Sequence, residues 1–212
     1  MSSKIMPVEP TSAPGPAHLR LVARRRAELR AALARVVPPG ARFVGEIGCG
    51  HGHFLTAYAA AHPRELCLGF DLRGERIARA ERKRERAALA RLHFFQAAAD
   101  DFLAALPAAA AFGTIFMLFP DPWPKRRHHK NRLIQPAFLD ALAARAGQGT
   151  RLYFRTDDRD YFAQAGGIIA GHSVWRLDPD ATWPFDAETV FQSRAASHQS
   201  LVAVCHRTGA PL

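Results

Sequence analysis

The sequence has little lysine, little cysteine and no long apolar run. Four of its 29 cationic residues are lysine and the other 25 are arginine, against 19 acidic residues. Cys49, Cys67 and Cys205 are odd in number and lack CxxC spacing, which favours reduced thiols and argues against a zinc site. Without about 18 consecutive apolar residues or an apolar segment near the first residue, neither a membrane span nor a signal peptide is expected. We therefore expect a cytoplasmic protein without a metal.

What the chain does have is a large positive charge. The formal net charge is +10, the sequence pI is about 10.5, and 48% of the residues are hydrophobic. Arginine forms planar, paired hydrogen bonds with phosphate, so a nucleic-acid partner is plausible from charge alone. The hydrophobic fraction and the length of 212 residues suit one globular domain.

The hydrophobic pattern predicts a flexible, proline-rich leader at residues 1–17 and a single domain at 18–212, which opens with an arginine-rich helix from His18 to Val36. Beyond that helix, strand-like runs alternate with helical stretches, an order typical of an α/β protein with an open, mostly parallel sheet. The expected strands are 42–47, 66–72, 92–96, 114–119 and 151–156, and the expected helices lie near 53–61, 74–90, 99–106 and 135–146. Two further runs, 173–177 and 201–206, are expected to pair antiparallel at the sheet edge.

The first motif is VGEIGCGHGHFL at residues 44–55, a glycine loop between a strand and a helix. Its GxGxG spacing lacks the third glycine of the dinucleotide fingerprint and the Lys-Ser/Thr ending of a P-loop, so NAD and ATP are disfavoured. Glu46 suits a cationic ligand, and Asp71 ends the next strand where an acid accepts ribose hydroxyls. A positively charged nucleoside such as S-adenosylmethionine meets both demands; the alternative is a tight turn with Glu46 as a cap. The predicted cofactor-binding residues are Glu46, Gly48, Gly50, Gly52 and Asp71.

The second motif is FPDPWPKRRHHKNR at residues 119–132. Together with the glycine loop, Thr156-Asp157 and the weaker TVFQSR at 189–194, it closely resembles the signature of the bacterial tRNA (guanine-N7)-methyltransferase family, FPDPWPKxRHxKxR. The resemblance covers residues 40–206 and implies a Rossmann-like class I methyltransferase fold, a twisted sheet with helices on both faces and an antiparallel edge strand. It also implies S-adenosylmethionine as the methyl donor and tRNA as the partner, with methylation at N7 of guanosine 46.

The residues of the second motif suggest a division of labour. Asp121 is the predicted catalytic residue, because a carboxylate can accept hydrogen bonds from the guanine edge and offset positive charge on the ring. The cations after it would hold phosphates, giving affinity that depends on salt. They are Lys125, Arg126, Arg127, Lys130 and Arg132. By resemblance, Asp157 and Thr189 lie around guanosine and cofactor, although the local sequence equally fits Asp157 as a helix cap.

Two positions depart from the family pattern. Gln192 stands where the family has glutamate, and a neutral amide cannot offset charge. Ala98 stands where the family has the aspartate that borders adenine and is, by resemblance, also a predicted cofactor-binding residue, with Asp100 and Asp101 following shortly after. These changes leave two alternatives open: a diverged RNA-binding paralogue without catalysis, or a methyltransferase that acts on another substrate. The many arginines of helix 74–90 are interpreted as an ordinary solvated face, because glutamates alternate with them.

Overall fold

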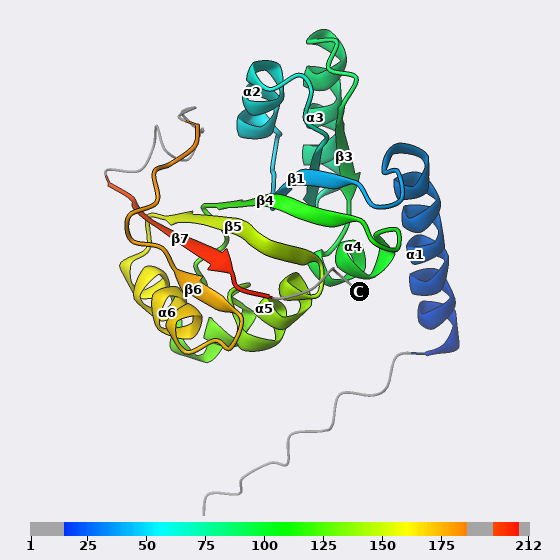
Figure 1. Ribbon diagram of the computed structural model, residues 1–212. Helices are drawn as coiled ribbons and strands as arrows, with labels where there is room; N and C mark the ends of the chain where they lie inside the picture. The colour runs from blue at the N-terminus through cyan, green and yellow to red at the C-terminus, as the bar shows by residue number, and fades with distance from the viewer. Residues whose placement is uncertain (1–14, 186–196, 208–212) are drawn as a thin grey trace, which may run out of the picture.

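The computed structural model describes residues 15–185 and 197–207. Within them, seven strands form one sheet in the order β3-β2-β1-β4-β5-β7-β6 (Figure 1). The strands are β1 (Arg42–Ile47), β2 (Cys67–Asp71), β3 (Leu92–Gln96), β4 (Ala111–Leu118), β5 (Ala146–Thr156), β6 (Trp175–Leu177) and β7 (Gln199–Cys205). The helices are α1 (Pro16–Val36), α2 (His53–Ala61), α3 (Gly74–Arg86), α4 (Ala99–Ala105), the short 3-10 helix η1 (Arg126–Asn131), α5 (Pro136–Ala143) and α6 (Arg159–Ala170).

The sheet topology confirms the predicted α/β architecture. Strands β1 to β5 pair in parallel, and β7 pairs antiparallel with both β5 and β6. The predicted antiparallel edge is therefore correct. The positions at which the strands of a parallel sheet end define one edge, and that edge is where a ligand crevice forms in open α/β sheets.

The central strands are apolar along their length because both faces of the sheet are covered. Every residue of β2 is buried, as is every residue of β1 after Arg42. Both β4 and β5 begin earlier than predicted, at Ala111 and Ala146. The added residues are rich in alanine and glycine and therefore give a weak strand signal, yet β1 supplies pairing partners for β4, and β4 does so for β5.

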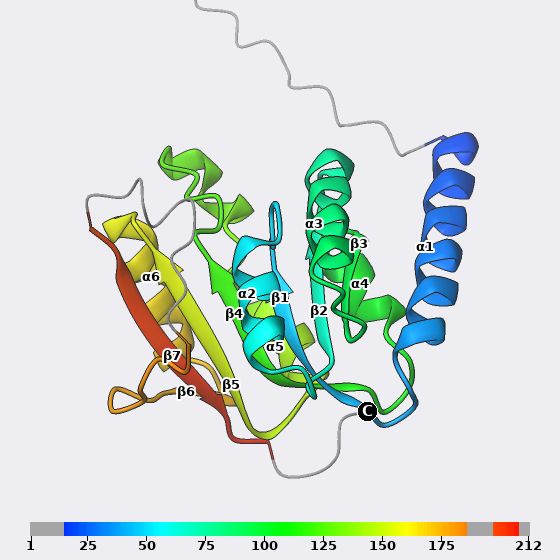
Figure 2. The same ribbon diagram turned by 90° about the horizontal axis from the view of Figure 1, so that it is seen from above.

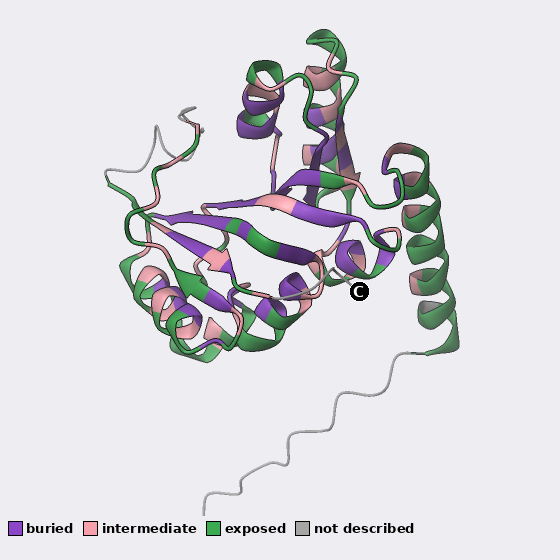
Figure 3. Cartoon of the chain, viewed as in Figure 1, coloured by how far each residue is buried: buried purple, intermediate pink, exposed green. Residues whose placement is uncertain are grey.

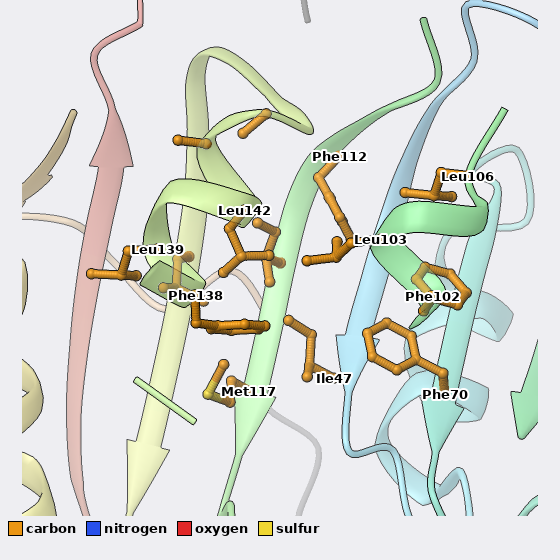
Figure 4. Close-up of a cluster of buried hydrophobic side chains, with 14 of the residues drawn as sticks. Ile47, Phe70, Phe102, Leu103, Leu106, Phe112, Met117, Phe138, Leu139 and Leu142 are labelled. Atoms are coloured by element: carbon orange, nitrogen blue, oxygen red, sulfur yellow. The ribbon is translucent and has the colours of Figure 1, made fainter. Parts of the chain in front are cut away.

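Two apolar cores lie on opposite faces of the sheet. One packs α4, α5 and α6 against the strands, and Figure 4 shows side chains of α4 and α5 meeting Ile47, Phe70 and Met117. The other packs α2 and α3 against the opposite face, with Phe54, Leu55 and Tyr58 among its members. The view in Figure 2 shows α1 beside α4, toward the β3 edge, while β6 and β7 lie at the far edge.

Helix α1 begins at Pro16, two residues before the predicted start, so Pro16 and Ala17 of the expected leader belong to it. Residues 1–14 lie outside the described part. Leu33 is fully buried in the first core, while most of the helix surface is exposed (Figure 3). Arg26 reaches α4, where its Nε lies 2.6 Å from Oδ1 of Asp101. The predicted helix is thus correct, but only the apolar residues of its second half pack inward, toward α4, while Leu19 and Leu21 are exposed.

Helix α6 follows β5 and is not among the helices expected from the sequence, although a helix cap at Asp157 is one of two interpretations of this stretch. Asp158, not Asp157, is its cap, because its carboxylate accepts the Tyr161 backbone N–H at 2.7 Å. Two adjacent glycines in the helix lower its intrinsic propensity, but Tyr161, Ala165 and Ile169 are buried and supply the packing that stabilises it. None of the helices in residues 15–185 and 197–207 combines the length and apolarity needed to cross a bilayer.

Candidate functional site

The glycine loop lies at the carboxyl ends of β1 and β2. The backbone N–H groups of Gly48 and Cys49 both donate to the carbonyl oxygen of Phe70, at 2.9 and 3.0 Å, which ties the loop to β2. Gly48, Gly50 and Gly52 all have positive φ, at 73°, 53° and 67°. Non-glycine residues adopt that region at a cost, so the loop requires glycine at these positions.

The three glycines differ in what surrounds them. A Cβ added at Gly48 or Gly50 would meet no atom within 4 Å, whereas one at Gly52 would lie 2.6 Å from the Phe94 ring. Gly48 and Gly50 therefore leave open space beside the backbone, where a ligand can approach closely. Gly52 instead lets α2 pack against β3 and α3, so its role is structural.

Asp71 lies next to this loop. Its Oδ2 accepts the Gly50 backbone N–H at 3.1 Å and lies 3.4 Å from the Arg76 guanidinium, while Oδ1 accepts the Arg73 backbone N–H at 2.8 Å. A carboxylate offers about four lone-pair positions. These contacts therefore fix the orientation of Asp71 and leave it capacity for a ribose hydroxyl.

Glu46 is a buried acid beneath the loop. It is 4% exposed, and its Oε2 has no hydrogen-bond partner. Burial raises the pKa of Glu46 to about 8; the backbone N–H of Leu55 opposes this rise and the negative charge of Asp71 adds to it. An orphaned carboxylate oxygen at this position fits a ligand that brings positive charge or hydrogen-bond donors, because either would offset the cost of burial.

At Ala98, no neighbouring acid replaces the aspartate of the family pattern. Ala98 is the N-cap of α4 and contributes no side-chain hydrogen bond. Asp101 is held by Arg26, and Asp100 is exposed. Neither acid takes the place of an aspartate at position 98, so this position has one carboxylate fewer than the family pattern.

The segment 119–132 follows β4 at the same sheet edge. Its first residue is tied to β5, because the Phe119 N–H donates to the Arg155 carbonyl at 2.8 Å. Phe119 and Trp123 have φ values of 50° and 45°, a backbone conformation that residues other than glycine adopt at a cost in free energy. Asp121 lies between them and is exposed. The strained turn thus presents the carboxylate to solvent at the edge where the parallel strands end.

The cations of this segment divide into two groups. Lys125, Arg127 and Lys130 are exposed, as the prediction of phosphate contacts requires. Arg132 is 2% exposed and turns inward, so its predicted role as a phosphate ligand is wrong. Its guanidinium instead donates hydrogen bonds to protein groups, including the Pro122 carbonyl oxygen at 2.7 Å. The pattern of basic residues gave no signal that one of them is buried.

Asp157 follows the last residue of β5 and is exposed. It lines a cavity of about 360 Å³ together with Arg159, Ser197, His198 and Gln199. Strands β4 and β5 are neighbours, so the turns that carry Asp121 and Asp157 come off the same part of the sheet edge. The other two predicted substrate-binding residues, Thr189 and Gln192, lie outside the described residues.

A second feature that sequence reasoning missed concerns Lys83 of α3. Its ammonium donates to the His51 carbonyl oxygen at 2.6 Å and lies 3.0 Å from Nε2 of His53. Burial and the nearby Arg86 and Arg79 charges lower the pKa of Lys83. The glycine loop is therefore fastened from both sides, by Asp71 and by Lys83. Glu81 of α3 pairs with Arg84 at 2.7 Å, but it also accepts the Phe94 backbone N–H at 2.9 Å, so this acid ties α3 to β3 and does not lie on a purely solvated face.

Comparisons with known proteins agree with this arrangement. A family described as "Putative methyltransferase" matches residues 41–199. A tRNA (guanine-N(7)-)-methyltransferase of Bordetella pertussis is 32% identical over 175 residues, which cover 81% of this chain and 67% of that protein. A protein of the same name from a Caulobacter species is 36% identical over 154 residues, covering 72% and 64%. The chain spans about two thirds of the length of these curated relatives.

Solved structures agree on the fold. The crystal structure of TrmN from Thermus thermophilus aligns with a TM-score of 0.56 at 17% identity, over 86% of this chain and 52% of that chain. At that identity the likeness concerns the fold alone. The matched segment of the family contains the glycine loop, both strand-end acids and the whole of segment 119–132. The chain belongs to this family of methyltransferases.

Proposed function

We propose that the protein transfers a methyl group from S-adenosylmethionine to N7 of a guanosine in tRNA, at variable-loop position 46. The observation that carries the proposal is the meeting of two motifs at one sheet edge. The glycine loop follows β1 and the Asp121 segment follows β4, and these strands are neighbours in the sheet. The names of the Bordetella and Caulobacter relatives support the same substrate. With tRNA as partner, the proposal also places the protein in the cytoplasm.

The cofactor would lie against the glycine loop. Gly48 and Gly50 would let the cofactor approach the backbone, and Asp71 would accept hydrogen bonds from its ribose hydroxyls. The Glu46 oxygen that has no partner would contact the positive charge or the hydrogen-bond donors of the cofactor. S-Adenosylmethionine, when bound, supplies an electrophilic methyl group on a positively charged sulfur. Glu46 and Asp71 differ in their surroundings: the first is desolvated and has one oxygen without a hydrogen-bond partner, while both oxygens of the second already accept backbone N–H groups. The two acids therefore suit different parts of one nucleoside.

The acceptor needs alignment more than proton removal. N7 of neutral guanine carries an available lone pair, so the reaction depends on lining up N7 with the methyl carbon and sulfur. Asp121 would accept hydrogen bonds from the guanine edge and offset the positive charge that grows on the ring. Pro120, Pro122 and Pro124 restrict the backbone on either side of it, so little freedom is lost when the base binds.

The backbone of the RNA would be held outside this turn. Lys125, Arg127 and Lys130 are exposed along the 3-10 helix η1 and its approach. Trp123 is 37% exposed and meets the His128 ring edge to face, at 5.8 Å between centroids. An exposed aromatic ring among cations is a surface on which an unstacked base can pack.

The test is methyl transfer from labelled S-adenosylmethionine to bulk tRNA that lacks modifications, followed by nucleoside mass spectrometry. The expected product is 7-methylguanosine, and a tRNA with guanosine 46 replaced by adenosine should give none. Cofactor binding with transfer to no tRNA would contradict the proposed substrate. Failure of both binding and transfer would contradict the proposed reaction and leave RNA binding as the remaining activity.

A further inference from the structure

Arg132 is the most deeply buried cation among the described residues, and it does not face solvent in the way that phosphate binding needs. Its side chain is 1% exposed. Nε donates to the Pro122 carbonyl oxygen at 2.7 Å, and Nη1 donates to Oε1 of Gln164 at 2.5 Å. Nη2 lies 3.5 Å from Oδ1 of Asp158, and the guanidinium carbon lies 4.9 Å from the centre of the Tyr161 ring. The guanidinium is thus surrounded by protein groups.

These partners belong to two separate parts of the site. Pro122 is the residue after Asp121, and Asp158 is the residue after Asp157. Gln164 and Tyr161 lie in α6, the helix that Asp158 caps. One planar group therefore connects the turn that carries Asp121 to the start of the helix beside Asp157.

Few other hydrogen bonds hold the turn that carries Asp121. Residues 120, 122 and 124 are prolines and have no N–H to donate. Among the described residues, the bond from Arg132 to Pro122 is the one hydrogen bond that the structure gives to segment 120–124. The flanking Phe119 and Trp123 have positive φ, a conformation that persists only when the surroundings hold it.

We propose that Arg132 is a positioning residue for methyl transfer: it holds the Asp121 turn at a fixed distance from the Asp157 end of α6. The inference rests on the proposed function. Arginine suits this task because its planar fork donates hydrogen bonds in two directions, to Pro122 and Gln164, and places Nη2 3.5 Å from the Asp158 carboxylate, whereas lysine presents one point charge on a flexible stem. The role of Arg132 is therefore indirect, since it acts through the Pro122 carbonyl and does not touch the base.

The test compares Arg132→Lys and Arg132→Met with the unchanged protein. Because a shift of about 1 Å in a reacting group can cost roughly 100-fold in rate, we expect kcat to fall about 100-fold in Arg132→Met. Arg132→Lys is expected to restore little of that loss. The KM for tRNA and the Kd for S-adenosylmethionine should each stay within about threefold, because neither the exposed cations nor the glycine loop is altered.

Three further variants separate positioning from its alternatives. Arg127→Met removes an exposed cation, so the slope of log Kd for tRNA against log salt should fall by about 0.7 to 0.9, while Arg132→Met should leave the slope unchanged. Trp175→Phe removes a buried hydrogen bond to the Leu139 carbonyl on the same side of the sheet and serves as a stability-matched variant with normal kcat. Asp158→Asn keeps a good helix cap but removes the carboxylate facing Arg132, and should lower kcat in the same direction.

Amide hydrogen exchange tests the proposal without relying on activity. In Arg132→Met, exchange should quicken at the hydrogen-bonded amides of residues 128–131 in η1, with the amides of β1 and β2 unchanged. If exchange in that segment is the same in Arg132→Met as in the parent protein, the proposal is overturned. This holds whether or not the parent protein methylates tRNA, because failure to methylate counts against the proposed function and not against the role of Arg132. The proposal would also be overturned by an unchanged kcat, by a reduced salt slope in Arg132→Met, or by an equal loss of kcat in Trp175→Phe.

Discussion

At the scale of single residues, Asp121 and Glu46 are two acids in opposite surroundings. Asp121 is exposed on a strained turn, and Glu46 is buried beneath the glycine loop. The first is accessible to a substrate that arrives from solvent, as an RNA base must. The second can act only on a ligand that enters the loop. Substituting each acid by its amide changes charge while keeping shape, so the two variants separate the substrate from the cofactor.

Asp121→Asn should lower kcat for tRNA methylation by about 100-fold or more, because it removes the charge that offsets the developing cation on the guanine ring. Binding of tRNA should remain within about threefold, since the phosphate-binding cations are untouched. Filter binding and single-turnover kinetics measure the two effects. Glu28→Gln is the matched control, because Glu28 is an exposed acid on α1 that pairs with the exposed Arg24, and α1 lies toward the β3 edge of the sheet. Equal kcat in both variants would remove Asp121 from its role.

Glu46 should give the stability of the cofactor-free protein a dependence on pH. Its folded pKa of about 8 lies above the ordinary value of 4.5, so between these values the folded state binds more protons than the unfolded state. Its contribution to stability is fully present below about pH 4.5 and is lost as the pH rises through 8. Glu46→Gln should therefore gain thermal stability relative to the unchanged protein as pH rises from 5 to 9, measured by melting temperature.

The same variant should bind S-adenosylmethionine more weakly, because a neutral amide cannot offset positive charge. At each pH, the difference in melting temperature between Glu46→Gln and the unchanged protein removes the contribution of the histidines, which both proteins share. A difference that stays constant from pH 5 to 9 would contradict the raised pKa of Glu46.

At the scale of elements, the glycine loop combines a ligand surface with a close packing of helix on strand. Gly50→Ala should keep the fold, at a cost of about 1–2 kcal/mol for a side chain at positive φ, and weaken cofactor binding by filling the open space. Gly52→Ala should destabilise the protein more, because its Cβ would clash with Phe94 and Ala80. Melting temperature and equilibrium dialysis with S-adenosylmethionine separate the two effects. Similar melting temperatures for both variants would contradict this division.

Also at this scale, the predictability of each element depended on how local its signal was. The bounds of β1, β3 and α2 match the prediction to the residue, because buried apolar runs end at prolines, glycines or polar residues. Helix α6 was missed, since its stability comes from tertiary burial of Tyr161 and Ile169. The glycine loop and Asp71 were placed together correctly. Arg132 was not, because a basic run in sequence looks the same whether a member faces solvent or turns inward.

At the scale of the whole molecule, the net charge of +10 predicts RNA affinity that falls steeply with salt. The double variant Lys125→Ala and Lys130→Ala should reduce the slope of log Kd against log salt by about 1.4 to 1.8, because each phosphate left without its cation lowers the slope by about 0.7 to 0.9. Arg82→Ala removes an exposed cation of α3 and should leave the slope unchanged if that helix is a solvated face. Filter binding over a range of roughly 50 to 300 mM salt measures both slopes.

The order of the strands has a consequence for how the chain assembles. β7 follows β6 in the sequence but lies between β5 and β6 in the sheet. As the chain leaves the ribosome, β6 emerges first and has no neighbour to pair with until β7 arrives. Until then the N–H and C=O groups along one side of β5 stay open, and an unpaired edge of that kind invites association with other chains. A nascent chain halted before residue 199 should thus need a chaperone that its finished form does not.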